Sequence, residues 1–282
     1  MRLVTAACLV MIASGGATAA PVERSALQRA RASYNQGHFD AAIVAARTAI
    51  TIPSDMDAAR LVLGRALLER YRERADVRDL DEARDELRAV DPSRLSPSDR
   101  GEWLLGYGQW LFVTERYGAA AELFENASSR PLAGGESAKD KVLDWWASAL
   151  ERHAQTSTGE RDRIFARMYD RMDAELQRDP GSVAANYWLV AAARALGELD
   201  RAWNASMAGW VRASMAGSRA DALRTDIDRL VLTGIIPDRA RAAAAEGHNQ
   251  RQAADTMVTE WERFKQEWVT RPNTTAEREQ SH

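Results

Sequence analysis

The sequence predicts an all-α protein that is built from stacked helical hairpins. Long runs of alternating Val, Ile and Thr, which would indicate β-strands, are missing along the chain. The composition, 45% hydrophobic and 28% charged with 8 prolines in 282 residues, is typical of a folded, helix-rich protein with a substantial core. Two segments of the chain have apolar residues in the same order and at the same spacing, and such a repeat indicates a solenoid.

The first 19 residues have the three parts of a secretory signal peptide. Arg2 is followed by an apolar run over residues 3–12 and by small residues over 13–20. The run is too short to span a bilayer, so we expect cleavage after Ala19 and no integral membrane span in the mature chain. Export to a bacterial periplasm or medium follows from this, and an uncleaved membrane anchor is the alternative.

The only cysteine, Cys8, lies inside this apolar run. The mature chain is therefore expected to carry no disulfide, no thiol nucleophile and no thiolate metal ligand. The formal charge is −3, and arginine supplies nearly all of the positive charge without forming a basic block. This distribution gives no indication of a nucleic-acid partner.

The segment YNQGHFDAAIVAARTAI, residues 34–50, reads as the end of one helix, a turn at Gly37-His38 and a second helix. Residues 101–128 have the same order, with a turn at Glu115-Arg116. When Phe39 is aligned with Tyr117, further positions coincide: Ala30 with Gly108, Ala42 with Ala120, Ala46 with Phe124, and Ala49 with Ala127.

This pattern resembles the tetratricopeptide repeat, a helix–turn–helix unit of about 34 residues with small residues in both helices and aromatic residues near the turn. Small positions let the two helices approach closely, and a bulky residue after the turn fills the space toward the next unit. The resemblance covers residues 25–212 and implies a right-handed α-solenoid. We assign the repeat domain to residues 20–216.

The remaining units follow the pattern less closely. Residues 63–92 form a second unit, whose turn is expected to be lengthened by the polar stretch YRERADVRD at residues 71–79. Residues 141–154 and 161–181 form a helix pair joined by a polar loop, and another unit starts at Ala185.

Residues 217–270 are predicted to be a C-terminal helical cap. A helix over residues 220–232 is followed by a turn at GIIPDRA and by a polar helix from Asp238 to about Val269. Trp261, Phe264 and Trp268 share one face of that helix, as a cap on the last repeat requires. Residues 271–282 have little apolar content and are predicted to be disordered.

The sequence contains no evident catalytic constellation. None of the four histidines has a neighbour at metal-ligand spacing. They are His38, His153, His248 and His282. Carboxylate clusters such as DLDEARDE alternate with arginines at i+3 and i+4, which is typical of a solvated helix face rather than of a general acid–base pair. We therefore expect a non-catalytic protein with no cofactor and no metal.

The nine tryptophans allow a second interpretation, in which exposed rings bind carbohydrate or peptidoglycan. Packing between helical units explains most of them. Trp145 and Trp146 are neighbours about 100° apart on one predicted helix, so we expect one of the two to be exposed.

In the repeat family, the first helix of each unit lines the concave side of the solenoid. Carried over to this chain, the resemblance implies eight groove residues: Arg31, Tyr34, Asn35, Arg65, Gln109, Phe112, Tyr187 and Arg194. Such a mixture suits an extended peptide or an acidic chain end, so the predicted function is a non-catalytic scaffold or adaptor for a protein or peptide partner. The alternatives are a groove filled by the chain's own segments and an all-helical glycosidase, and the oligomeric state stays open.

Overall fold

The computed structural model describes residues 25–132 and 134–269, and the protein is helical over these ranges, with no strand among the described residues. The predicted signal peptide and the predicted C-terminal tail lie outside them. The all-α class is confirmed. The first helices are α1 (Ala26–Asn35), α2 (Phe39–Ile50), α3 (Met56–Arg74), α4 (Val77–Arg88), α5 (Pro97–Val113) and α6 (Tyr117–Ser128).

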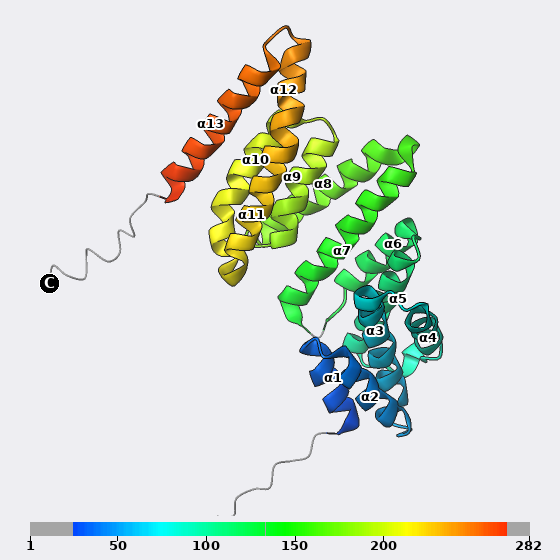
Figure 1. Cartoon of the computed structure of the whole chain (residues 1–282). Coiled ribbons are helices and arrows are strands. Elements are labelled where there is room, and N and C mark those ends of the chain that lie inside the picture. Colours follow the sequence, from blue (N-terminus) through cyan, green and yellow to red (C-terminus); the bar gives the residue numbers. More distant parts are fainter. Residues whose placement is uncertain (1–24, 133, 270–282) are drawn as a thin grey trace, which may run out of the picture.

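The second part of the chain continues in the same way after the long helix α7 (Gly135–Thr156), which has 22 residues. Its helices are α8 (Arg161–Arg178), α9 (Val183–Ala195), α10 (Leu199–Arg212), α11 (Ala220–Leu230), α12 (Ile236–Ala245) and α13 (Gln250–Val269). In Figure 1, α7 lies between the group α1–α6 and the group α8–α13.

Each helix from α1 to α11 packs against the next one along the chain, a π-helix (Val231–Ile235) connects α11 to α12, and α12 packs against α13. A second set of contacts joins alternate helices: α1 with α3, α3 with α5, α7 with α9, and α9 with α11. The first helices of the hairpins therefore lie side by side over much of the molecule. Three of them start in the same way, because a serine hydroxyl accepts a hydrogen bond from a backbone N–H at Ser25, Ser96 and Ser182.

The hairpins α1–α2, α5–α6 and α9–α10 have turns with the same hydrogen bonds. In each turn a backbone N–H donates to the carbonyl five residues earlier: His38 to Ser33 at 2.9 Å, Arg116 to Leu111 at 2.8 Å and Glu198 to Ala193 at 3.0 Å. The residue before each donor has a positive φ: 75° at Gly37, 64° at Glu115 and 77° at Gly197. This hydrogen bond and backbone conformation are those of a Schellman helix end. The predicted turn positions Gly37-His38 and Glu115-Arg116 are confirmed.

Small residues bring the paired helices together, as the aligned positions predict. Ala30 on α1 and Ala42 on α2 are fully buried. At the aligned position in α5, a Cβ on Gly108 would lie 2.5 Å from the ring of Phe124 on α6. The two helices approach this closely because position 108 has no side chain.

The second hairpin differs from its prediction. Residues 71–79 do not form a long turn, because α3 continues to Arg74 and α4 begins at Val77. Arg70 on α3 pairs with Asp40 on α2 at 2.9 Å and with Asp79 on α4 at 2.6 Å. These charges, which suggested a solvated turn, instead hold an extended helix against its two neighbours.

The C-terminal region also differs from its prediction. The expected turn at residues 234–240 is a π-helix (Val231–Ile235) that leads directly into α12, with Pro237 in the first turn of that helix, where its missing N–H costs nothing. The single polar helix expected from Asp238 is divided into α12 and α13, and Gly247 between them has a φ of 93°.

Trp261 anchors α13 to the preceding helices. It is fully buried, its ring centre lies 5.8 Å from that of Trp203 and 5.6 Å from that of Trp210, and its Nε1–H donates to Asp228 at 2.8 Å. The predicted apolar stripe of this helix thus meets α10 and α11. None of the described helices combines the length and the apolar content that crossing a membrane requires.

Candidate functional site

A groove with a volume of about 690 Å³ lies between α1, α3 and α5 on one side and the N-terminal half of α7 on the other. We call it the α7 groove. Its apolar lining includes Leu61, Val62, Leu105, Val142 and Trp145. In Figure 1 the N-terminal end of α7 lies beside α1, and residues of both helices line the groove. Its volume falls within the range of about 300–1,000 Å³ that is usual for ligand sites.

Five of the eight predicted groove residues line this groove: Arg31, Tyr34, Asn35, Arg65 and Gln109. They come from α1, α3 and α5, which the contacts between alternate helices place side by side. The fold therefore brings together residues that are far apart in the sequence.

The other three predicted residues do not line the groove. Phe112 lies behind it, with its ring centre 5.1 Å from that of Trp145. Tyr187 lines a second cavity, on the far side of α7. Arg194 is used inside the fold, because its guanidinium fills the space left by Gly234 and its Nε donates to Asp238 at 2.7 Å.

The arginines of the α7 groove pair with acidic residues that were not among the eight predicted groove residues. Three ion pairs result: Arg31 on α1 with Asp99 on α5 at 3.0 Å, Arg72 with Glu69 within α3 at 2.7 Å, and Arg65 on α3 with Glu102 on α5. Only the Arg65–Glu102 pair is well buried, with side chains 13% and 10% exposed. Three of the four cations in the groove are therefore already neutralised.

Lys141 is the fourth cation and was not among the predicted residues. Its side chain is exposed, and among the described residues it makes no ion pair. It projects from α7 and lines both the α7 groove and the second cavity. Sequence reasoning missed it because the residues carried over came from the first three helical units and from one near position 190.

Two buried polar atoms at the groove have no hydrogen-bond partner: Oε1 of Gln109 and Nε of Arg65. Gln109 is only 3% exposed, and its Nε2 donates to Glu69 at 3.2 Å. Above Arg65 lies the ring of Tyr34, whose centre is 4.8 Å from the guanidinium carbon. Burial raises the pKa of Tyr34, although the charge of Arg65 acts in the opposite direction. The phenol is therefore neutral at physiological pH.

The tryptophans do not form an exposed binding surface. Trp146 is 2% exposed, and the other eight are buried or half-buried. Trp145, the half-buried member of the neighbouring pair, contacts Phe124 at 5.7 Å between ring centres and lies 4.8 Å from the guanidinium of Arg72. The expectation that one of the pair is exposed is therefore wrong, because the groove wall and the core use both rings.

The second cavity, of about 530 Å³, lies between α7, α9 and α11. Asp144 in its wall accepts a hydrogen bond from Nε1 of Trp188 at 2.7 Å, and burial raises the pKa of this carboxyl group. Arg219 and Arg229 supply positive charge beside Asp140 and Asp226. The described lining of this cavity has three carboxylates against two arginines and Lys141, which it shares with the α7 groove.

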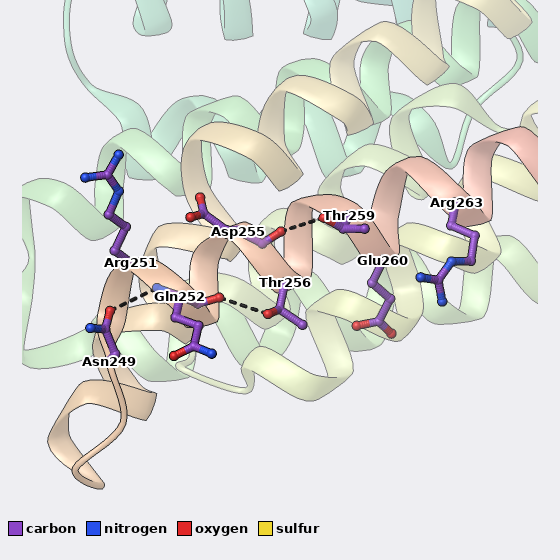
Figure 2. A pocket seen from close by; sticks show the side chains of 8 residues that line it. All are labelled: Asn249, Arg251, Gln252, Asp255, Thr256, Thr259, Glu260 and Arg263. Carbon is purple, nitrogen blue, oxygen red and sulfur yellow. Dashed lines mark hydrogen bonds between the residues drawn. The ribbon is translucent and has the colours of Figure 1, made fainter.

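A further concavity runs along α13, and Figure 2 shows that helix α13 and the residue before it supply the side chains that line it. Thr256 and Thr259 donate to backbone carbonyls one turn earlier in the same helix, at 2.9 Å each. It is a polar helix face without an opposing wall. No cluster of His, Cys, Asp or Glu in the described parts of the chain could hold a metal ion.

Comparison of the chain with protein-family models, with curated proteins and with solved structures gives no match. The functional conclusion therefore rests on the geometry of the α7 groove.

Proposed function

We propose that the chain is an exported, non-catalytic adaptor that holds a protein or peptide partner in the α7 groove. The observation that carries this proposal is the meeting of Arg31, Tyr34, Asn35, Arg65 and Gln109, from three separate helices, in one open groove. A groove with apolar walls and a few polar groups, lined by α1, α3, α5 and α7, suits an extended chain. The proposed export rests on the residue pattern of positions 1–19.

The proposal includes a right-handed solenoid of tetratricopeptide-like repeats. The equal turns of α1–α2, α5–α6 and α9–α10, and the contacts between alternate helices, support this part. In such an arrangement the first helices face the inside of the curve, and the first helices α1, α3 and α5 supply one wall of the α7 groove. Carbohydrate binding through exposed tryptophans has no comparable support, since none of the nine is exposed.

A groove-blocking substitution tests the proposal. Ser137 is an exposed residue on the α7 wall of the groove, and Ser137→Trp would place a large ring in the space for a partner. Ala41→Trp adds the same ring to an exposed position of α2 outside the groove. After crosslinking in cells, we expect the wild type and Ala41→Trp to recover the same partners and Ser137→Trp to lose them. Recovery of the same partners by a folded Ser137→Trp variant would contradict the proposal.

A further inference from the structure

The α7 groove has one positive charge in excess. Its described lining contains three carboxylates and four cations, and three of those cations already have carboxylate partners. Lys141 is the cation for which the described residues provide no carboxylate partner. The acidic residues nearest to it on its own helix are Asp140 and Asp144. Their contacts go to other elements, Asp140 to Arg219 and Asp144 to Trp188, so neither is turned toward the Lys141 ammonium group.

The groove also offers a buried acceptor without a donor. Oε1 of Gln109 has no partner, while the rest of that carboxamide is fixed by its bond to Glu69. A buried acceptor of this kind is normally satisfied, by protein, water or ligand. A ligand that fits must supply a negative charge at Lys141 and apolar groups against Leu105 and Val142, whereas this buried oxygen of Gln109 can accept from a ligand only after the side chains around it move.

We infer that the α7 groove recognises an extended peptide segment that carries an Asp or Glu side chain, with the carboxylate on Lys141. This inference rests on the proposed function, which it narrows from any peptide to an acidic one. One carboxylate balances the one cation in the described lining that has no ion pair, whereas a phosphate dianion would add negative charge beside Glu69, Asp99 and Glu102. Lys141 is the specificity-determining residue.

Peptide arrays test the inference directly. The full chain is incubated with randomised ten-residue peptides that are acetylated and amidated, so that side chains carry their only carboxylates. We expect the bound peptides to be enriched in Asp or Glu, and Lys141→Gln to weaken their binding about three- to fivefold, as for a solvent-accessible ion pair. Lys141→Glu should reverse the preference toward Lys and Arg.

Lys139→Gln is the matched control. Lys139 is on the same helix, but it pairs with Glu136 at 2.7 Å and does not line the groove. It should bind the same peptides as the wild type. A second array has peptides with free C-terminal carboxylates and no acidic side chains. It tests whether the protein recognises a chain-end carboxylate instead of a side-chain carboxylate. Binding to that array alone would overturn the assignment to an Asp or Glu side chain.

The possible results separate the inference from the proposed function. If Ser137→Trp abolishes peptide binding and Lys141→Glu leaves the selected peptides unchanged, the inference is overturned and the proposed function stands. If the wild type binds no peptide, or if Ser137→Trp binds the same peptides as the wild type, both are overturned.

Discussion

Gly37 and Glu115 occupy the same position in two equivalent turns, with φ angles of 75° and 64°. Glycine adopts this left-handed conformation freely, whereas the Cβ of glutamate meets the neighbouring carbonyl oxygen. The α5–α6 hairpin therefore has a strained residue where the α1–α2 hairpin has a relaxed one.

The first prediction follows from this strain. Glu115→Gly should stabilise the protein by about 0.5–1 kcal/mol, because relief of the strained φ exceeds the added entropy of the unfolded chain. Gly37→Ala should destabilise it by about 1 kcal/mol, since a Cβ there meets no atom within 4 Å and only the backbone conformation matters. Urea unfolding of both variants measures the effects. A loss of stability in Glu115→Gly would show that residue 115 is not strained.

A second prediction concerns the approach of α5 to α6. Gly108→Ala should destabilise the protein by about 1–2 kcal/mol, because its Cβ would lie 2.5 Å from the fully buried ring of Phe124. Gly159→Ala, where a Cβ meets nothing within 4 Å, should change stability by less than about 0.5 kcal/mol. Thermal unfolding followed by circular dichroism compares them, and equal melting temperatures would contradict the close packing at residue 108.

The Arg65–Glu102 pair supports a third prediction. Arg65→Met should destabilise the protein by about 3 kcal/mol, because it removes the guanidinium that neutralises the buried Glu102 carboxylate. Arg31→Met breaks the Arg31–Asp99 pair, but Arg31 is 45% exposed, so the loss should stay below about 1 kcal/mol. Chemical denaturation measures both free energies of unfolding. Equal losses would mean that the burial of Arg65 does not matter.

A fourth prediction uses the pKa of Tyr34, which burial raises. Above the ordinary tyrosine pKa of about 10, the unfolded chain releases this proton before the folded chain does, so stability falls as pH rises through that range. Tyr34→Phe lacks the proton and should lose less stability between pH 8 and pH 11 than the wild type. The other tyrosines are present in both proteins and cancel in the difference. Parallel losses on urea unfolding would contradict the raised pKa.

Much of the fold could be predicted from local sequence patterns. The turns at Gly37 and Glu115 were found because small, aromatic and turn residues recur at a constant offset, and the same offset placed Gly108 against Phe124. Five groove residues were found because the first helices of the hairpins lie side by side. Periodicity along one chain is enough for such features.

The rest depends on contacts between distant residues. The sequence does not show that Arg70 reaches Asp40 and Asp79, so the helical continuation of α3 was taken for a turn. It likewise does not show that Arg194 lies against Gly234 of the π-helix and pairs with Asp238. Lys141 was missed because its importance comes from the pairing of every other cation in the groove, which only the folded structure determines.

The most direct test of the central claim is site-specific photo-crosslinking in living cells. A photoreactive phenylalanine is placed at Asn35, an exposed residue that lines the α7 groove, or at Val44, which is 66% exposed on α2 outside the groove. The proposed function predicts a discrete crosslinked partner at position 35 and no such product at position 44, and the further inference predicts that the product at position 35 is lost when Lys141→Glu is added. No crosslink at position 35, or the same product from both positions, would contradict the proposed function.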